Sequence, residues 1–327
     1  MKKKSTAILV ALCAAFIPLI AGCNACGGET GAALDGRMPW YMPTLYEFSE
    51  FKIEKYLMKV DSDEIKRDRL LAEGTASFTL EEAESSGNAR LSICVTVTYN
   101  GDDANGTSRN LTDSMNSEVV FSKTTLLPVT SKKSVKSAKR AGAEDMSYEV
   151  TVDYENAQAV LNRANQNKPE TKSINIGSQT FDNEQLFFAM RAFSALAPGS
   201  SQSFRLLQPY QSFVYDRGTY PMGMTVAGEL TEFALDFYKN DNLYGMELGE
   251  NSKPKVNAMC ATVSISEENR GPAIKAYYSS QPFKISTNIS TNKVLVGITE
   301  TSYGATLNQR TDTFYTLSDY RASTVSQ

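Results

Sequence analysis

Alternation of apolar and polar residues recurs along this chain and limits its fold more than any other feature. From Leu91 to Tyr99, every second side chain is apolar and the residues between them are Ser, Cys or Thr. Successive side chains of a strand point to opposite faces, so this segment predicts a half-buried β-strand. The same pattern predicts strands that end at Phe78 and Leu80, begin at Val119 and Phe121, or occupy segments 148–154, 259–265 and 294–298.

Turn residues separate the predicted strands. Asn100-Gly101, Asn105-Gly106 and the segments 239–242 and 269–272 are typical turn sequences. Such short connections favour antiparallel pairing, because parallel strands need long crossovers. The alternation changes phase between Thr225 and Tyr238, which predicts a bulge or bend near Thr231.

One amphipathic helix is predicted over residues 182–197. Asp182 and Gln185 have the spacing of a capping box, and Pro198-Gly199 would end the helix. Its apolar face would consist of Leu186, Phe187, Met190 and Phe193. We therefore expect a mainly β protein, with an antiparallel, strongly curved sheet or partly open barrel covered by this helix. Residues 155–166 fit either a second helix or a hairpin.

Residues 1–22 have the features of an export signal. Three lysines precede an apolar run from Ala7 to Ile20, which is shorter than the roughly 20 residues of a membrane-spanning helix. A positive head, a short apolar stretch and small residues at the end are typical of a secretory signal peptide.

The end of this signal resembles the bacterial lipobox. In Ile20-Ala21-Gly22-Cys23, an aliphatic and two small residues precede a thiol that can carry diacylglycerol. The resemblance implies that Cys23 becomes the first mature residue and is lipidated. The protein would then be anchored to a bacterial membrane on its extracytoplasmic side. The alternative is an ordinary signal peptide that ends near a cysteine.

Three segments follow from these features. Residues 1–22 form the predicted signal, and residues 23–44, rich in Gly and Pro, form a flexible tether. A β-rich domain is expected over residues 45–322. Asn24 stands where an aspartate often marks inner-membrane retention, which leaves inner and outer membranes both open.

Composition argues against several functional classes. The sequence contains no histidine, which removes Ser-His-Asp and Cys-His catalysis and the usual zinc sites. Its net charge of −4 argues against a nucleic-acid partner. We therefore expect no enzyme activity, no metal and no cofactor.

Two polar stretches have a functional and a simpler interpretation. The segment 102–106 resembles part of a calcium loop, but Gly101 and Thr112 would occupy positions that need carboxylates. An ordinary polar loop is the simpler interpretation. The basic residues could touch an anionic surface or form a solvated face; they are Lys123, Lys132, Lys133, Lys136, Lys139 and Arg140.

Several residues are candidates for a binding site. Methionine and aromatic side chains on a concave sheet could hold an apolar ligand, and ordinary core packing would explain them equally. The candidates are Met222, Met224, Phe187, Met190 and Phe193. Cys94 and Cys260 could form a disulfide, since export permits one, or remain two free thiols.

The stretch from Glu118 to Gly304 resembles the exported bacterial family catalogued as domain of unknown function 3108. The matching pieces, in order, are FSKTTLLPVT (121–130), FDNEQLFFAMRAF (181–193), Pro198-Gly199, MTVAGELTEFALDFY (224–238), AYYSSQPFK (276–284) and NKVLVGITETSYG (292–304). The resemblance implies an antiparallel, strongly curved sheet like that of half-barrel lipoprotein carriers. It implies no activity and no catalytic residues.

Three functional hypotheses follow. The first is an envelope lipoprotein, anchored through membrane lipid, that binds an apolar or amphipathic ligand or an envelope protein on its concave face. The second is a purely structural or interaction module. The third is a carboxylate-based cell-wall hydrolase, which needs two acids facing each other at about 5–9.5 Å.

Overall fold

A computed structural model describes residues 45–61, 64–85, 87–140, 145–177, 179–193, 196–210, 213, 219–235, 247–248, 254–265, 274–284, 290–303 and 310–324. The predicted signal, Cys23, the tether and the turns at 239–242 and 269–272 lie outside these residues. Among the described residues, no helix has the length and apolarity needed to cross a bilayer.

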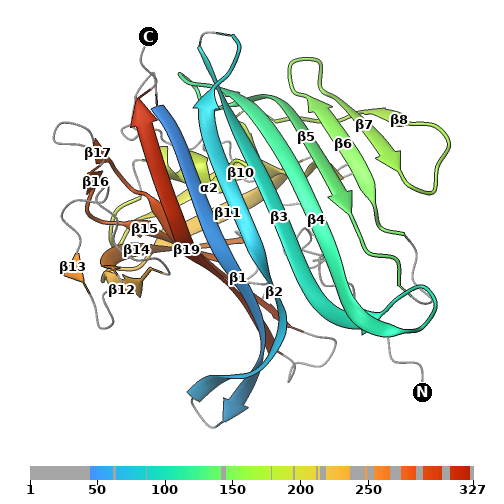
Figure 1. The fold of residues 1–327 in the computed structure, drawn as a ribbon. Coiled ribbons are helices and arrows are strands. Elements are labelled where there is room, and N and C mark those ends of the chain that lie inside the picture. The colour runs from blue at the N-terminus through green and yellow to red at the C-terminus, as the bar shows by residue number, and fades with distance from the viewer. Residues whose placement is uncertain are drawn as a thin grey trace.

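Long antiparallel strands form the first half of the structure (Figure 1). They are β1 (Leu45–Asp61), β2 (Glu64–Glu82), β3 (Asn88–Asp102), β4 (Ser108–Ser122), β5 (Pro128–Lys136), β6 (Tyr148–Asp153), β7 (Gln158–Arg163) and β8 (Glu170–Ser173). Each of these strands pairs with the next one along the chain, as expected for hairpin connections.

The remaining strands continue the same sheet from its β1 side. They are β9 (Thr180–Asp182), β10 (Ser201–Leu207), β11 (Thr219–Val226), β12 (Thr231–Ala234), β13 (Glu247–Leu248), β14 (Pro254–Ile265), β15 (Ile274–Ser279), β18 (Leu295–Tyr303) and β19 (Arg310–Thr324). From β1 the pairing runs to β19, β18, β15, β14, β11, β10 and β9, and only β9 and β10 pair in parallel among the described strands. A separate small hairpin joins β16 (Phe283–Lys284) to β17 (Ser290–Thr291).

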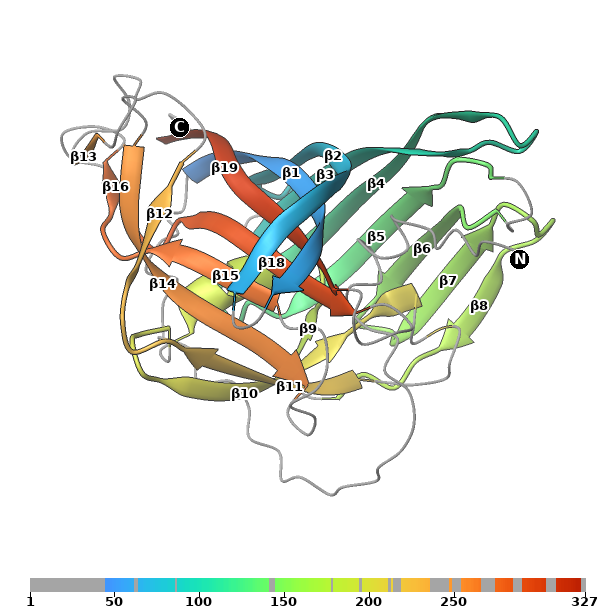
Figure 2. The same ribbon diagram turned by 90° about the horizontal axis from the view of Figure 1, so that it is seen from below.

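The sheet curls so that its two halves enclose a common interior. Figure 2 shows β10 and β11 across this interior from the β1–β4 wall. The described strands β8 and β9, at the two ends of the series, do not pair with each other. The predicted class is confirmed: the protein is mainly β, with one large, open and curved sheet.

The concave face carries the core because inward positions line up across the strands. One such row runs through Leu317, Phe51, Ala76, Val95 and Met115, and all five side chains are buried. Along β3 the burial alternates with a period of two, as the sequence pattern predicts.

The predicted strand at Val119 and Phe121 is misplaced. These residues end β4, which already begins at Ser108. The alternation was hidden because two inward positions, Asp113 and Ser117, are polar and yet buried. Asp113 is held there by the backbone N–H of Ala138 at 2.7 Å and by the Arg140 guanidinium at 2.6 Å.

Of the two turns predicted after the strand 91–99, one is confirmed and one is wrong. Asn105-Gly106 lies in the turn that the chain makes at residues 103–107, whereas Asn100-Gly101 lies inside β3. Asp103 accepts hydrogen bonds from the backbone N–H groups of Asn105 and Thr107 at 2.8 and 3.0 Å, which stabilises this turn. The simpler interpretation of the segment, an ordinary polar loop, therefore accounts for its structure.

Two local questions are resolved. Segment 155–166 forms a hairpin return, because β7 pairs back onto β6. A bend interrupts the strand near Thr231: Val226 pairs with Ala261 and Thr231 pairs with Ala258, so the β11–β12 side contains extra residues.

The helix is much shorter than predicted. It consists of α2 (Leu186–Ala189) and one 3₁₀ turn, η1 (Met190–Ala192), rather than residues 182–197. Asp182 lies in β9 and forms two capping hydrogen bonds with the turn. Its Oδ1 accepts from the backbone N–H of Glu184 at 2.8 Å, and its own backbone N–H donates to Gln185 Oε1 at 3.3 Å. Phe193 ends the helix in an extended conformation and packs against Phe181 and Phe204. Every residue of α2 is buried, so this helix fills the interior instead of covering it.

Candidate functional site

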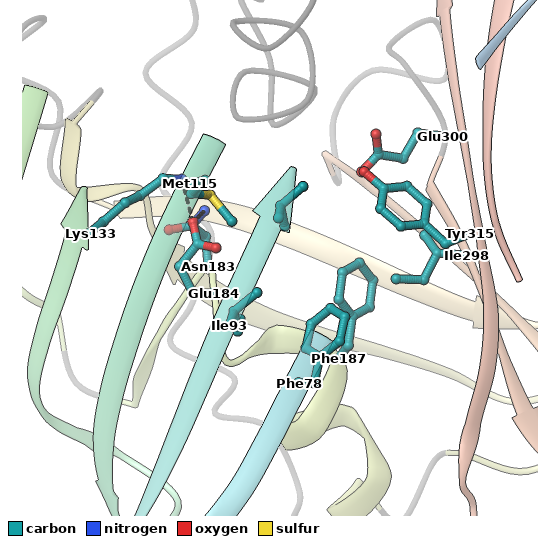
Figure 3. Close-up of a pocket in the computed structure, with 11 residues that line it drawn as sticks. Phe78, Ile93, Met115, Lys133, Asn183, Glu184, Phe187, Ile298, Glu300 and Tyr315 are labelled. Atoms are coloured by element: carbon teal, nitrogen blue, oxygen red, sulfur yellow. Dashed lines mark hydrogen bonds and ion pairs between the residues drawn. The ribbon is translucent and has the colours of Figure 1, made fainter. Parts of the chain in front are cut away.

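A cavity of about 50 Å³ lies between α2 and the concave face of the sheet. Figure 3 shows the residues around it. Its lining consists of Phe78, Ile93, Val95, Met115, Lys133, Asn183, Glu184, Phe187, Ile298, Glu300 and Tyr315. The volume is smaller than the roughly 150 Å³ apolar cavity that admits benzene, so the cavity suits a few waters or a ligand group of few heavy atoms.

The middle of the cavity is apolar. Ile93 and Val95 project from β3 at alternate, inward positions, and Phe78 projects from β2. Phe187 reaches the same space from α2, with Ile298 nearby on β18 (Figure 3). These walls favour an apolar group by the ordinary hydrophobic effect.

A buried ion pair forms one polar side of the cavity. Lys133 Nζ on β5 lies 2.5 Å from Glu184 Oε1, and the two side chains are only 7% and 10% exposed. Asn183 Nδ2 donates to the same carboxylate oxygen at 2.8 Å. Asn183 Oδ1 is buried and has no hydrogen-bond partner among the described residues. A buried acceptor without a donor is costly, so this oxygen suits a ligand or water that donates.

The turn that presents these groups is fixed from behind. Tyr154 O–H donates to Asp182 Oδ2 at 2.6 Å. Burial, together with the nearby charge of Glu184, raises the pKa of Asp182 above its ordinary value. Gln185 Nε2 donates to the Leu126 carbonyl at 2.7 Å, which ties the turn to the loop before β5.

Glu300 and Tyr315 form the opposite polar side (Figure 3). Glu300 is 7% exposed on β18, and burial raises its pKa to about 8, although Lys55 and the Tyr315 hydrogen bond act in the opposite direction. Lys55 and Glu300 both pair with Thr313, so the three residues form one inward row across β1, β19 and β18. Burial lowers the pKa of Lys55.

The cavity therefore combines an apolar middle with ionisable groups on opposite sides. Among the described residues, no cationic nitrogen forms an ion pair with Glu300 within 4 Å. No group of three or more potential metal ligands occurs in the part of the chain that the structure describes. The arrangement is suited to holding a small amphipathic group.

Comparison with known families identifies the chain. The family described as "Protein of unknown function (DUF3108)" matches residues 55–229. The chain belongs to this family. The suspected resemblance is thereby confirmed, although the predicted signal and anchor are not part of that match.

This DUF3108 member was also compared with solved structures and with curated proteins. It is similar to the β-barrel-like protein of domain of unknown function DUF1849 from Brucella abortus, with a TM-score of 0.44 and 10% identity. The match covers 86% of this chain and 99% of that chain. No curated protein matches.

Of the predicted ligand-facing residues, the structure brings Phe187 to the cavity. The others are buried in the core outside its lining: Met222 and Met224 on β11, Met190 in η1, and Phe193 after it. Core packing accounts for these four. Cys94 and Cys260 carry free thiols on β3 and β14, so the alternative of two separate thiols holds.

The polar cavity residues were missed as a site. Glu300 comes two residues after Ile298, the last residue of the predicted strand 294–298, and so points to the same inward face. A charged residue where the pattern expects an apolar one was the signal that could have indicated the site. Lys133 belonged to the basic run, whose members mostly pair with acids: Lys123 with Glu82, Lys132 with Glu149, Lys133 with Glu184 and Arg140 with Asp113. Lys136 and Lys139 are exposed.

Proposed function

We propose that this DUF3108 member is an exported protein, held to a bacterial membrane by lipid on Cys23, that binds a small amphipathic molecule inside its curled sheet. The cavity between α2 and the concave face is the observation that carries the binding proposal. Its apolar middle and its polar sides match a ligand with both characters. The anchoring part is supported by the lipobox-like residues Ile20–Cys23 alone.

The cavity volume limits the ligand. At about 50 Å³, the cavity takes a short chain or one end of a longer molecule. A sugar ring does not fit, so we do not extend the proposal to a glycosidase, although Glu184 and Glu300 are acids on opposite sides of the space.

Metabolic labelling tests the anchor. Cells expressing the full chain are grown with labelled palmitate, and the membrane fraction is compared for wild type and Cys23→Ser. We expect label and membrane retention in wild type and loss of both in the variant. Equal retention without label would remove the lipid anchor from the proposal.

Native mass spectrometry tests ligand binding. The full chain, purified in detergent, is incubated with envelope lipid and metabolite extracts, and adduct masses are recorded. Val95→Phe should reduce adducts because it fills the cavity from β3. Met224→Leu, a buried change outside the lining, is the matched control and should retain them. Clean apo protein in every case would contradict the binding proposal.

A second candidate function, an interaction module, is favoured by the exposed start of β2. Residues 64–70 are all exposed, and Ile65 and Leu70 are both 44% exposed. Single exposed apolar residues are normal on a protein surface, so it is the place of these two on one fully exposed segment that favours contact with another envelope protein. Co-purification of one such protein that is lost in Ile65→Asp/Leu70→Asp, but retained in Lys66→Glu, would favour this function.

A further inference from the structure

We propose that the ligand enters the cavity as a protonated aliphatic amine whose ammonium group binds Glu300. This inference rests on the proposed ligand-binding function and names the chemistry of the ligand's polar end. Two acceptors on residues that line the cavity carry it: the Glu300 carboxylate on one side and the unpartnered Asn183 Oδ1 on the other.

Within the described part of the chain, no cation forms an ion pair with Glu300. The nearest cation in its own row, Lys55, sits two strands away with Thr313 between them. Tyr315, which is uncharged, forms a hydrogen bond with Glu300. A buried carboxylate in this position gains strongly from an ammonium group, which brings both charge and hydrogen-bond donors.

Asn183 gives an independent indication of a donor-bearing ligand. Its side chain is 4% exposed, and its Nδ2 is engaged with Glu184. Its Oδ1 lacks a partner and suits a second N–H group of the ligand or a water bound with it. For an anionic ligand, the cation among the lining residues, Lys133, is already paired with Glu184.

The walls between these acceptors suit the alkyl part of an amine. Phe78 and Phe187 both line the cavity, and Figure 3 shows them between the two polar sides. Aromatic faces attract an alkylammonium group through cation–π contact, in addition to ordinary burial of its carbons. A neutral alcohol would gain the burial and one donated hydrogen bond, but not the attraction between charges.

Amine binding must also be linked to protons. Without ligand, burial holds Glu300 largely protonated at neutral pH, since its pKa is about 8. Binding of an ammonium group would ionise it and release that proton. The groups that face Glu300 are Lys55 from β1, Tyr315 from β19 and Glu184 from the turn before α2. Amine affinity should therefore rise between pH 6.5 and 8.

Calorimetry with the detergent-purified full chain tests the inference, with n-butylamine, n-butanol and butyrate as probes. We expect butylamine to bind at least about tenfold more tightly than butanol at pH 8, as a charged hydrogen bond provides. Glu300→Gln should remove both this preference and the pH dependence of amine binding. Lys55→Met should shift the rise in amine affinity to higher pH, because Lys55 favours the ionised form of Glu300.

The outcomes separate the inference from the function on which it rests. Equal affinity for amine and alcohol, tighter binding of butyrate, or amine binding unaffected by both substitutions would overturn the ammonium assignment and leave the cavity as a binding site. Binding of none of the three probes would overturn the ammonium assignment, while adducts from the extracts would still support the function. Lys55→Met keeps the test informative where Glu300→Gln fails to fold.

Discussion

Glu300 shows how one inward charge changes the energetics of an otherwise apolar face. Its neighbours across β15 and two residues back along β18, Ile274 and Ile298, are buried and apolar. Desolvation is the main cause of its raised pKa. The proton is therefore held more tightly in the folded chain than in the unfolded chain, which makes stability depend on pH.

We predict that the titration of Glu300 lowers the free energy of unfolding as pH rises from about 4.5 to 8. In this window the folded state binds more protons than the unfolded state, since the carboxyl pKa is about 8 when folded and 4.5 in the reference state. Glu300→Gln cannot titrate, so its stability relative to wild type should increase across this window. The difference should reach at most roughly 4 kcal/mol.

Urea unfolding at pH 5, 6.5 and 8 measures this difference. The matched control is Glu73→Gln, which alters an exposed glutamate on β2. Parallel stability curves for wild type and Glu300→Gln would show that the buried carboxyl is not the source of the effect.

At the element scale, the short helix is held by polar contacts inside the core. Arg191 is fully buried and lies 2.6 Å from Glu47 on β1, and it also donates to the Asn292 carbonyl at 3.0 Å. Tyr278 O–H donates to the Phe187 carbonyl at 2.8 Å. These contacts position the helix turn that supplies one wall of the cavity.

We predict that Arg191→Met destabilises the fold by about 3–5 kcal/mol, because it leaves the Glu47 carboxylate buried without its partner. The double variant Glu47→Leu/Arg191→Met should recover most of the loss, since two apolar side chains replace the pair. Chemical denaturation of the four proteins in this cycle measures both effects. A double variant as unstable as Arg191→Met would show that the ion pair itself, rather than the orphaned charge, stabilises the helix.

At the scale of the whole molecule, the two ends of the open sheet are joined by side chains. Tyr148 at the start of β6 stacks on Tyr210 with ring centroids 4.1 Å apart. A second apolar cluster lies along this seam and consists of Val150, Val152, Ala159, Leu161, Ile174, Leu207 and Phe213. Packing of this kind closes the curl without strand pairing between β8 and β9.

We predict that Tyr210→Ala loosens the β6–β8 end of the sheet and leaves β1–β4 unchanged. Loss of a stacked aromatic pair costs about 1 kcal/mol, so amide exchange in β6–β8 should accelerate about fivefold. Hydrogen–deuterium exchange measures both regions in one experiment. Tyr303→Ala, at an exposed position on β18, is the matched control; uniform acceleration across the sheet would contradict a local role for the seam.

Much of the fold could be predicted because strand formation leaves a local signal. The alternation from Leu91 to Tyr99 marks an inward and an outward face, and β3 follows it. The signal failed in β4, where Asp113 occupies an inward position. A polar residue can be buried there only because Ala138 and Arg140 supply its hydrogen bonds from far along the chain. No local pattern contains that information.

The sequence by itself determined several of the strands, their mainly antiparallel pairing, the curved class of the sheet and the family of the chain. The tertiary structure decided the length of the helix, which ends where Phe193 packs between Phe181 and Phe204. It also decided the cavity, because Lys133, Glu184 and Glu300 meet only once β5, the turn before α2 and β18 surround one space. Periodicity states which way a side chain points, whereas the residues it faces depend on pairings between distant strands.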